Sequence, residues 1–149
     1  MRPTKQEYYL DIALAVSKRS TCLKRHYGAV IVNHDEIIAT GYNGSPRGDI
    51  NCCDVGVCMR VNAKRYSGYE QCKSIHAEQN AIISASRQEM LGATLYLSCE
   101  YQNELGEWVE DISDEVKPCP FCNRMIDNSG ILNVVTRGLK SSQIEQLIL

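Results

Sequence analysis

Apolar residues recur along this chain with two periods, one typical of helices and one typical of strands. Residues 4–18 place them on one side of a helix, and Thr4 and Glu7 form the expected capping box at its start. Two β-rich runs follow at 28–33 and 36–41, separated by two residues with turn chemistry. The pattern therefore predicts a helix followed by a β-hairpin.

The second half of the chain alternates helical and strand patterns after a loop-like stretch at 41–68. Strands are expected at 93–98 and 131–135, and helices at about 75–87, 118–128 and 141–148. A strand, a helix and a strand in this order form by default a right-handed unit with parallel strands. Together with the hairpin, this predicts an α/β protein: a three-layer α/β/α sandwich with a central mixed sheet, in a single domain over residues 1–149.

Charge and hydropathy narrow the expected partners. The 149 residues carry a formal net charge of −2, so no basic field attracts a nucleic-acid backbone, and nucleic acid is not the expected partner. No run approaches the roughly 20 apolar residues of a membrane helix, so no membrane association is expected. The N-terminus lacks the apolar core of a signal peptide, which predicts a cytoplasmic location.

The cysteine content is unusual for a chain of this kind. The eight cysteines are Cys22, Cys52, Cys53, Cys58, Cys72, Cys99, Cys119 and Cys122. In a cytoplasmic chain thiols stay reduced, and clustered cysteines more often bind metal than form disulfides.

Two short motifs place metal ligands and an acid at the starts of two predicted helices. His76 precedes Glu78 by two residues, and Cys119 and Cys122 lie on the first turn of the later helix, where the helix dipole favours thiolates. One imidazole and two thiolates leave a tetrahedral zinc with one open position, where the pKa of a bound water falls to about 7. Glu78 is expected beside this water as catalytic acid and base rather than as a ligand.

Each motif alone has ordinary explanations. A Cys-x-x-Cys pair is as common in structural zinc sites and redox centres, and a His-Ala-Glu triplet by itself carries little information. Together, each at a helix start and with a strand between them, they match the described signature of zinc-dependent base deaminases, His-x-Glu followed by Pro-Cys-x-x-Cys. The combination therefore predicts a catalytic zinc held by His76, Cys119 and Cys122, with Glu78 as the catalytic residue.

Further motifs point to one family. They are His76-Ala77-Glu78, Pro118 to Cys122, the strand Gly28 to Val32, the run Gly-Tyr-Asn-Gly-Ser-Pro-Arg-Gly at 41–48, and Asn51-Cys52-Cys53-Asp54. With these motifs the chain resembles the cytidine and deoxycytidylate deaminase superfamily over nearly its whole length, and within it the deoxycytidylate (dCMP) deaminase branch. The resemblance implies a cytidine-deaminase-like fold and hydrolysis of dCMP to dUMP and ammonia, supplying dUMP for thymidylate synthesis. It also implies a homo-oligomer, commonly a hexamer, and in many members regulation by dCTP and dTTP.

The resemblance also suggests substrate contacts. Asn43 can offer a donor and an acceptor to a sugar hydroxyl, although an Asn-Gly pair also simply makes turns. Ala77 of the first motif is expected at the substrate as well. For the 5′-phosphate the candidate cations are Lys24, Arg25 and Arg47, of which Arg25 is favoured, although each is compatible with a solvated surface charge.

Some dCMP deaminases hold a second, structural zinc in the long loop. Cys22 and Cys52 match the positions of its cysteine ligands, and the remaining ligands in those members include histidines. Here we nominate Cys58 and Cys72, so that the donor set becomes four thiolates, as in closed structural sites. Cys53 is an alternative to Cys52, and the alternative to a metal site is a set of small buried apolar side chains.

One segment departs from the family pattern. Residues 99–117, rich in Glu and Asp, separate a strand from the Pro-Cys motif, which family members often join almost directly. This acidic insertion is expected to be a surface hairpin or loop that alters the rim of the pocket. Two other functions stay open: a related cytidine or adenosine deaminase acting on another nucleoside or on tRNA, and a zinc-organised competence or binding module without turnover. A tRNA substrate calls for a basic surface, and an acid such as Glu78 has no use in a purely structural module.

Overall fold

A mixed sheet forms the middle of the molecule in the computed structural model, which describes residues 1–60, 64 and 67–138. Its strands are β1 (Arg25–Asn33), β2 (Glu36–Tyr42), β3 (Thr94–Gln102), β4 (Trp108–Glu110) and β5 (Asn133–Thr136). The order β2-β1-β3-β4 runs across the sheet, and β5 also pairs with β3. The helix predicted at 141–148 lies outside the described residues.

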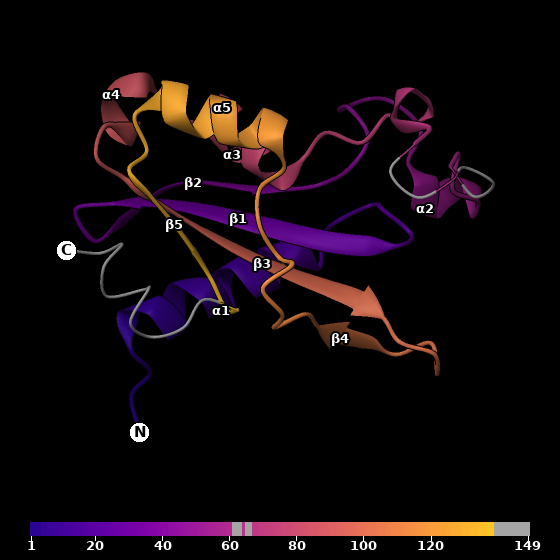
Figure 1. Cartoon of the computed structure of the whole chain (residues 1–149), viewed down its shortest axis with the longest axis horizontal. Coiled ribbons are helices and arrows are strands. Elements are labelled where there is room, and N and C mark those ends of the chain that lie inside the picture. The colour runs from indigo at the N-terminus through magenta and orange to yellow at the C-terminus, as the bar shows by residue number, and fades with distance from the viewer. Residues whose placement is uncertain (61–63, 65–66, 139–149) are drawn as a thin grey trace.

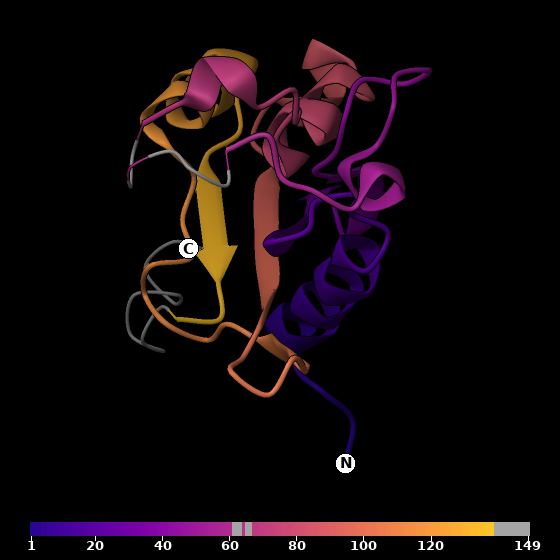
Figure 2. The same ribbon diagram turned by 90° about the vertical axis from the view of Figure 1, so that its right-hand side faces the viewer.

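The pairing directions make the sheet mixed, as predicted. Strand β1 is antiparallel to both β2 and β3, whereas β5 is parallel to β3. The two short strands share one edge of β3: β5 pairs with its first half and β4 with its end. Figure 2 shows β3 and β5 side by side, as expected for the two strands of a strand–helix–strand unit.

Helices cover both faces of the sheet (Figure 1). Helix α1 (Lys5–Ser17) packs on one face, and α3 (Ala77–Ile83), α4 (Arg87–Met90) and α5 (Pro120–Ser129) lie on the other. The short helix α2 (Cys52–Val55) and a 3-10 turn (Tyr69–Gln71) belong to the long loop. The predicted three-layer α/β/α sandwich is therefore confirmed. No described helix is long and apolar enough to cross a membrane.

The two faces of the sheet carry separate apolar cores. One core, around Ile31, Leu95 and Leu97, lies beneath α3 and α5. The other, around Val30 and Val135, lies beneath α1. Neighbours on one strand, such as Val30 and Ile31, serve opposite cores because successive side chains of a strand point to opposite faces.

Two predicted elements have different bounds in the structure. The helix predicted over 75–87 is divided, because α3 ends at Ile83 and Ser86 caps a new helix through the backbone N–H of Glu89. The strand predicted over 93–98 extends to Gln102, because the first part of the acidic insertion keeps pairing with β1 and adds β4. The predicted surface hairpin in the insertion is confirmed by this β3–β4 pair.

Candidate active site and metal centre

Two helix starts converge above the sheet. His76 is the N-cap residue of α3, and Cys119 is the N-cap residue of α5, where its sulfur accepts a hydrogen bond from the backbone N–H of Cys122 at 3.4 Å. Strand β2 can approach α3 closely because residue 41 is a glycine: a Cβ there would lie 2.3 Å from the carbonyl oxygen of Ala77. Capping and this close contact fix where the two motifs meet.

The three predicted ligands lie at the spacing that zinc requires. His76 Nδ1 is 3.6 Å from Cys119 Sγ and 3.3 Å from Cys122 Sγ. Ordinary zinc–nitrogen and zinc–sulfur bonds at a tetrahedral angle separate such atoms by about 3.6 Å. Among the residues that the structure describes, these three form the one group of metal-binding side chains whose ligand atoms all lie within 4.8 Å of one another. An imidazole and two thiols at these distances fit a zinc ion.

Glu78 lies beside the metal centre and outside its ligand group. It occupies the first turn of α3, and only 4% of its surface is exposed. Burial raises the pKa of its carboxyl above the ordinary value, although its own backbone N–H, His76 and a hydrogen bond with Cys122 act in the opposite direction. A buried carboxyl whose pKa is raised holds a proton more readily than an exposed one, which suits a general acid and base.

Cys122 depends on a cation for its ionised form. Burial raises the pKa of its thiol, and the nearby Glu78 carboxylate and Cys119 raise it further. A thiolate is the form that binds zinc, and a bound cation removes the cost of the charge. The site is therefore electrostatically suited to a divalent metal.

Tyr27 and Cys99 lie on the sheet face under this site, a position that the sequence analysis did not predict for either residue. Cys99 is fully buried, and Tyr27 is half-buried against the same core. Burial raises the pKa of the Tyr27 hydroxyl, with further contributions from Cys99 and from Glu78, which places Tyr27 near the Glu78 carboxyl. The usable signal was the alternation along β1, which gives Tyr27 the same face as Ala29 and Ile31.

The predicted substrate residues occupy defined positions. Asn43 is 8% exposed, and its side-chain amide accepts from the backbone N–H of Tyr27 at 2.8 Å and donates to the carbonyl of Arg25 at 3.0 Å. Ala77 is fully buried at the start of α3. The amide of Asn43 thus holds the β1 backbone and retains one donor and one acceptor position for another partner.

The three candidate phosphate cations separate in space. The Arg25 guanidinium forms an ion pair with Asp111 of the acidic insertion. Lys24 is exposed. Arg47 lines a polar cavity of about 370 Å³, together with Arg19 and Asn80.

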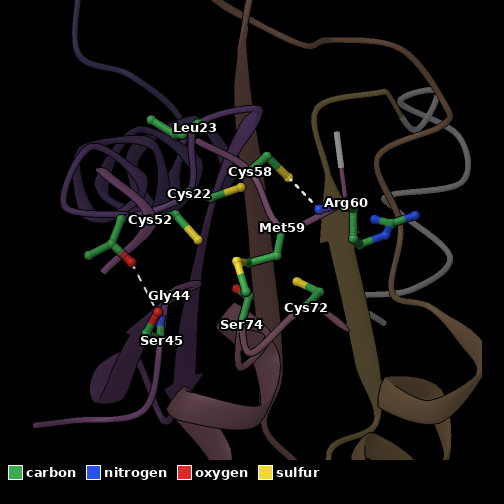
Figure 3. A pocket seen from close by; sticks show the side chains of 11 residues that line it. Cys22, Leu23, Gly44, Ser45, Cys52, Cys58, Met59, Arg60, Cys72 and Ser74 are labelled. Atoms are coloured by element: carbon green, nitrogen blue, oxygen red, sulfur yellow. Dashed lines mark hydrogen bonds between the residues drawn. The ribbon is translucent and has the colours of Figure 1, made fainter. Parts of the chain in front are cut away.

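The four cysteines nominated for a second zinc surround one small pocket. Figure 3 shows Cys22, Cys52, Cys58 and Cys72 around this pocket of about 20 Å³, with the side chain of Met59 among them and the Cys58 sulfur accepting from the backbone N–H of Arg60 at 3.4 Å. Burial raises the pKa of Cys52, and the other three thiols add to the effect because they are close by. They do not meet the 4.8 Å spacing of the first group, so the four sulfurs are gathered but not at ligand distances. Cys53, the alternative to Cys52, is exposed.

Comparison with known proteins identifies the class of this site. The family model described as "Cytidine and deoxycytidylate deaminase zinc-binding region" matches residues 3–137. The chain belongs to this family, and the predictions of the family and of a zinc cofactor are confirmed.

Individual relatives support the same placement. The chain is 38% identical to the deoxycytidylate deaminase of Schizosaccharomyces pombe over 90% of its own length, and it spans 37% of the length of that relative. It is 36% identical to the deoxycytidylate deaminase of Mycobacterium phage D29, with 90% of this chain and 94% of the phage protein covered. A dCMP deaminase of the cyanophage S-TIM5, solved in complex with dCMP and dUMP, is similar with a TM-score of 0.61 and 26% identity, covering 91% of this chain and 82% of that one.

Proposed function

We propose that this protein is a zinc-dependent hydrolase that deaminates dCMP to dUMP and ammonia. The observation that carries the proposal is the group of His76, Cys119 and Cys122 at zinc-binding distances, with buried Glu78 beside it. The relatives with this substrate in their names, one of them matched over nearly its full length, support dCMP as the substrate. So does the cyanophage neighbour that was solved with dCMP and dUMP.

The roles of the residues follow from their chemistry. His76, Cys119 and Cys122 would hold zinc, which when bound supplies a water acidic enough to ionise near pH 7. Glu78 accepts one proton as water adds to C4 of the cytosine ring and passes it to ring nitrogen N3. It then accepts the proton of the new C4 hydroxyl and passes it to the departing amine. Ammonia leaves and the C4 carbonyl forms, so that one water is consumed for each ammonia released. Asn43 and Ala77 are proposed to contact the nucleoside, and Arg25 the phosphate.

The activity test compares four possible substrates. Loss of cytosine absorbance is followed with dCMP, CMP, deoxycytidine and dCTP, using the wild type and Glu78→Gln. We expect turnover of dCMP and a fall of about 10²- to 10⁴-fold in Glu78→Gln, because the variant keeps the shape of the side chain and loses the proton carrier. Zinc content of the variant is the control, since Glu78 is not proposed as a ligand. Absence of turnover with all four compounds would favour a non-catalytic zinc module instead.

We also propose a second, structural zinc held by Cys22, Cys52, Cys58 and Cys72. It is supported by the shared pocket that all four line (Figure 3). On binding, the sulfurs would move together around the ion, which fits the long loop that carries three of them. Metal analysis is expected to give two zinc ions per chain in the wild type and one in Cys58→Ser/Cys72→Ser. One zinc in both proteins would remove this proposal without affecting the first site.

The remaining expectations concern regulation, assembly and context. We infer that dCTP and dTTP act as effectors and that the chain forms a homo-oligomer, with the hexamer implied by the family resemblance. The polar cavity lined by Arg19 and Arg47 is of a size and charge compatible with a nucleotide, which supports the binding of dCTP and dTTP as effectors. Activity with and without dCTP, and sedimentation in both conditions, test these two points. A single domain over 1–149 and a cytoplasmic location stay predictions from the sequence.

A further inference from the structure

A cation lies on the active-site face of the sheet at the outer end of β1. Because side chains alternate along a strand, Arg25 shares the face of Tyr27, which lies near Glu78. Arg25 therefore lies one strand repeat from Tyr27, at the N-terminal end of β1. A nucleotide whose base lay at the metal centre would bring its phosphate to Arg25 by pointing along this face of β1.

The guanidinium of Arg25 is held along one edge. Both of its hydrogen bonds use Nη2, one to Cys99 Sγ at 3.4 Å and one to the Asp111 carboxylate. The group also lies 5.6 Å from the ring centre of Tyr27 and 5.8 Å from that of Tyr101. Its Nε is buried without a hydrogen-bond partner, while 38% of the side chain is exposed. The guanidinium is thus fixed in place with donors still to be satisfied.

Asp111 is rigidly anchored. Its side chain is 11% exposed, its Oδ1 accepts from the backbone N–H of Ser113 at 3.0 Å, and its own N–H donates to the carbonyl of Cys99 at 2.8 Å. Hydrogen bonds from Ser113 and Arg25 outweigh burial and keep the pKa of Asp111 below its ordinary value. Releasing Arg25 would leave a buried charge without its partner, which is costly. Asp111 is therefore suited to orient Arg25 and unsuited to exchange with another anion.

The neighbouring amide links this cation to the proposed sugar contact. Asn43 binds the carbonyl of Arg25 and the N–H of Tyr27, so the two proposed contacts belong to one hydrogen-bonded unit. In a nucleotide the 5′-phosphate is joined to the sugar by only a few covalent bonds. A sugar bound at Asn43 therefore keeps its phosphate close to this unit. An arginine is the side chain best matched to such a group.

From this geometry we propose that Asp111 of the acidic insertion is a positioning residue, which holds Arg25 in the orientation that binds the 5′-phosphate of the substrate. The inference rests on the proposed function and explains what the insertion contributes to it. Asp111 does not touch the substrate. It acts through Arg25 and makes the enzyme selective for the nucleotide over the nucleoside.

The test compares dCMP with deoxycytidine, which lacks the phosphate. Arg25→Gln is expected to raise KM for dCMP roughly 10- to 100-fold, and Asp111→Asn roughly three- to tenfold, because charge-assisted hydrogen bonds to the phosphate are lost or misdirected. The kcat/KM for deoxycytidine should stay within about twofold in both variants. Asp111→Glu should recover part of the loss, since it keeps the charge. Glu110→Gln is the matched control, because Glu110 is the adjacent acid of the insertion and pairs with Arg137 instead.

Equilibrium binding of dUMP, measured by calorimetry, provides a readout that does not depend on turnover. It should weaken in Arg25→Gln and Asp111→Asn by the same factors as KM and be unchanged in Glu110→Gln. A lower KM for dCMP in Asp111→Asn would show that the carboxylate competes with phosphate, and equal losses with dCMP and deoxycytidine would show a structural role. Either result overturns the proposal. If the wild type turns over neither compound, the proposed function fails, and dUMP binding alone decides the role of Asp111.

Discussion

Gly28 sets the distance between α1 and the sheet. A Cβ at this position would lie 1.9 Å from the carbonyl oxygen of Ala13 and 2.6 Å from the backbone nitrogen of Ser17. Both neighbours are helix backbone, which cannot yield as a flexible side chain can. The absent side chain therefore allows α1 to lie directly on β1.

Gly28→Ala is expected to destabilise the protein by about 1–3 kcal/mol or more, because the extra methyl group forces α1 away from β1. Denaturant unfolding followed by circular dichroism measures the loss. The control is Thr40→Ala in β2, an exposed position where the change should cost less than about 1 kcal/mol. Equal stability of Gly28→Ala and the wild type would contradict the close packing.

At the scale of elements, Asn43 joins the end of β2 to the start of β1. Its side chain replaces a ladder contact by binding the N–H of Tyr27 and the carbonyl of Arg25. Its own N–H donates to the carbonyl of Tyr27, and its own carbonyl accepts from the N–H of Thr21. Asn43, in the loop that follows β2, thus holds the start of β1, the strand that carries Tyr27 under the metal centre.

Asn43→Ala should lower the free energy of unfolding by about 1–3 kcal/mol, because two backbone groups lose their partner. Asn43→Asp should fall between alanine and the wild type, since a carboxylate still accepts from Tyr27 but cannot donate to Arg25. Chemical denaturation of the three proteins tests this order. If alanine proves as stable as asparagine, the amide does not hold β1, and the sugar contact becomes its one remaining role.

For the whole molecule, a buried acid links helix α1 to two strands. Glu100 of β3 accepts from Lys18, just past the end of α1, at 2.9 Å, and lies 2.9 Å from the ring of His26 in β1. His26 also stacks on Trp108 of β4, with ring centres 3.7 Å apart. Burial alone would raise the pKa of Glu100, but the hydrogen bonds with His26 and Lys18 outweigh it and lower the pKa.

This lowered pKa gives stability a defined pH dependence. The folded protein binds fewer protons at Glu100 than the unfolded chain, whose glutamate titrates near 4.3, so the contribution is present above about pH 4.3 and is lost as the pH falls toward the folded-state value. Glu100→Gln should lower the unfolding temperature clearly at pH 7 and progressively less as the pH falls below about 4. Scanning calorimetry at pH 7 and at a pH below about 4 measures the difference in unfolding temperature between Glu100→Gln and the wild type. Glu104→Gln, at an exposed position, is the control. A constant difference across the pH range would count against the ionised pair.

Several features of the molecule followed from the sequence alone, because they depend on neighbours along the chain. The capping box of Thr4 and Glu7, the hairpin of β1 and β2, and the parallel β3–β5 pair were all predicted. So was the group of metal ligands, because His76 and Cys119 stand at helix starts and each motif specifies its own local geometry.

Tertiary structure decided what depends on residues distant in sequence. No pattern indicated that Tyr27 and Cys99 lie under the metal centre, or that Asp111 of the insertion pairs with Arg25, 86 residues away. Alternation assigns a side chain to a face of its strand, but only the order of strands in the sheet and the helices above them determine what that face meets. The sequence by itself therefore determined which side chains form the metal site. The packed fold determined that Tyr27 and Cys99 lie under it and that Asp111 pairs with Arg25.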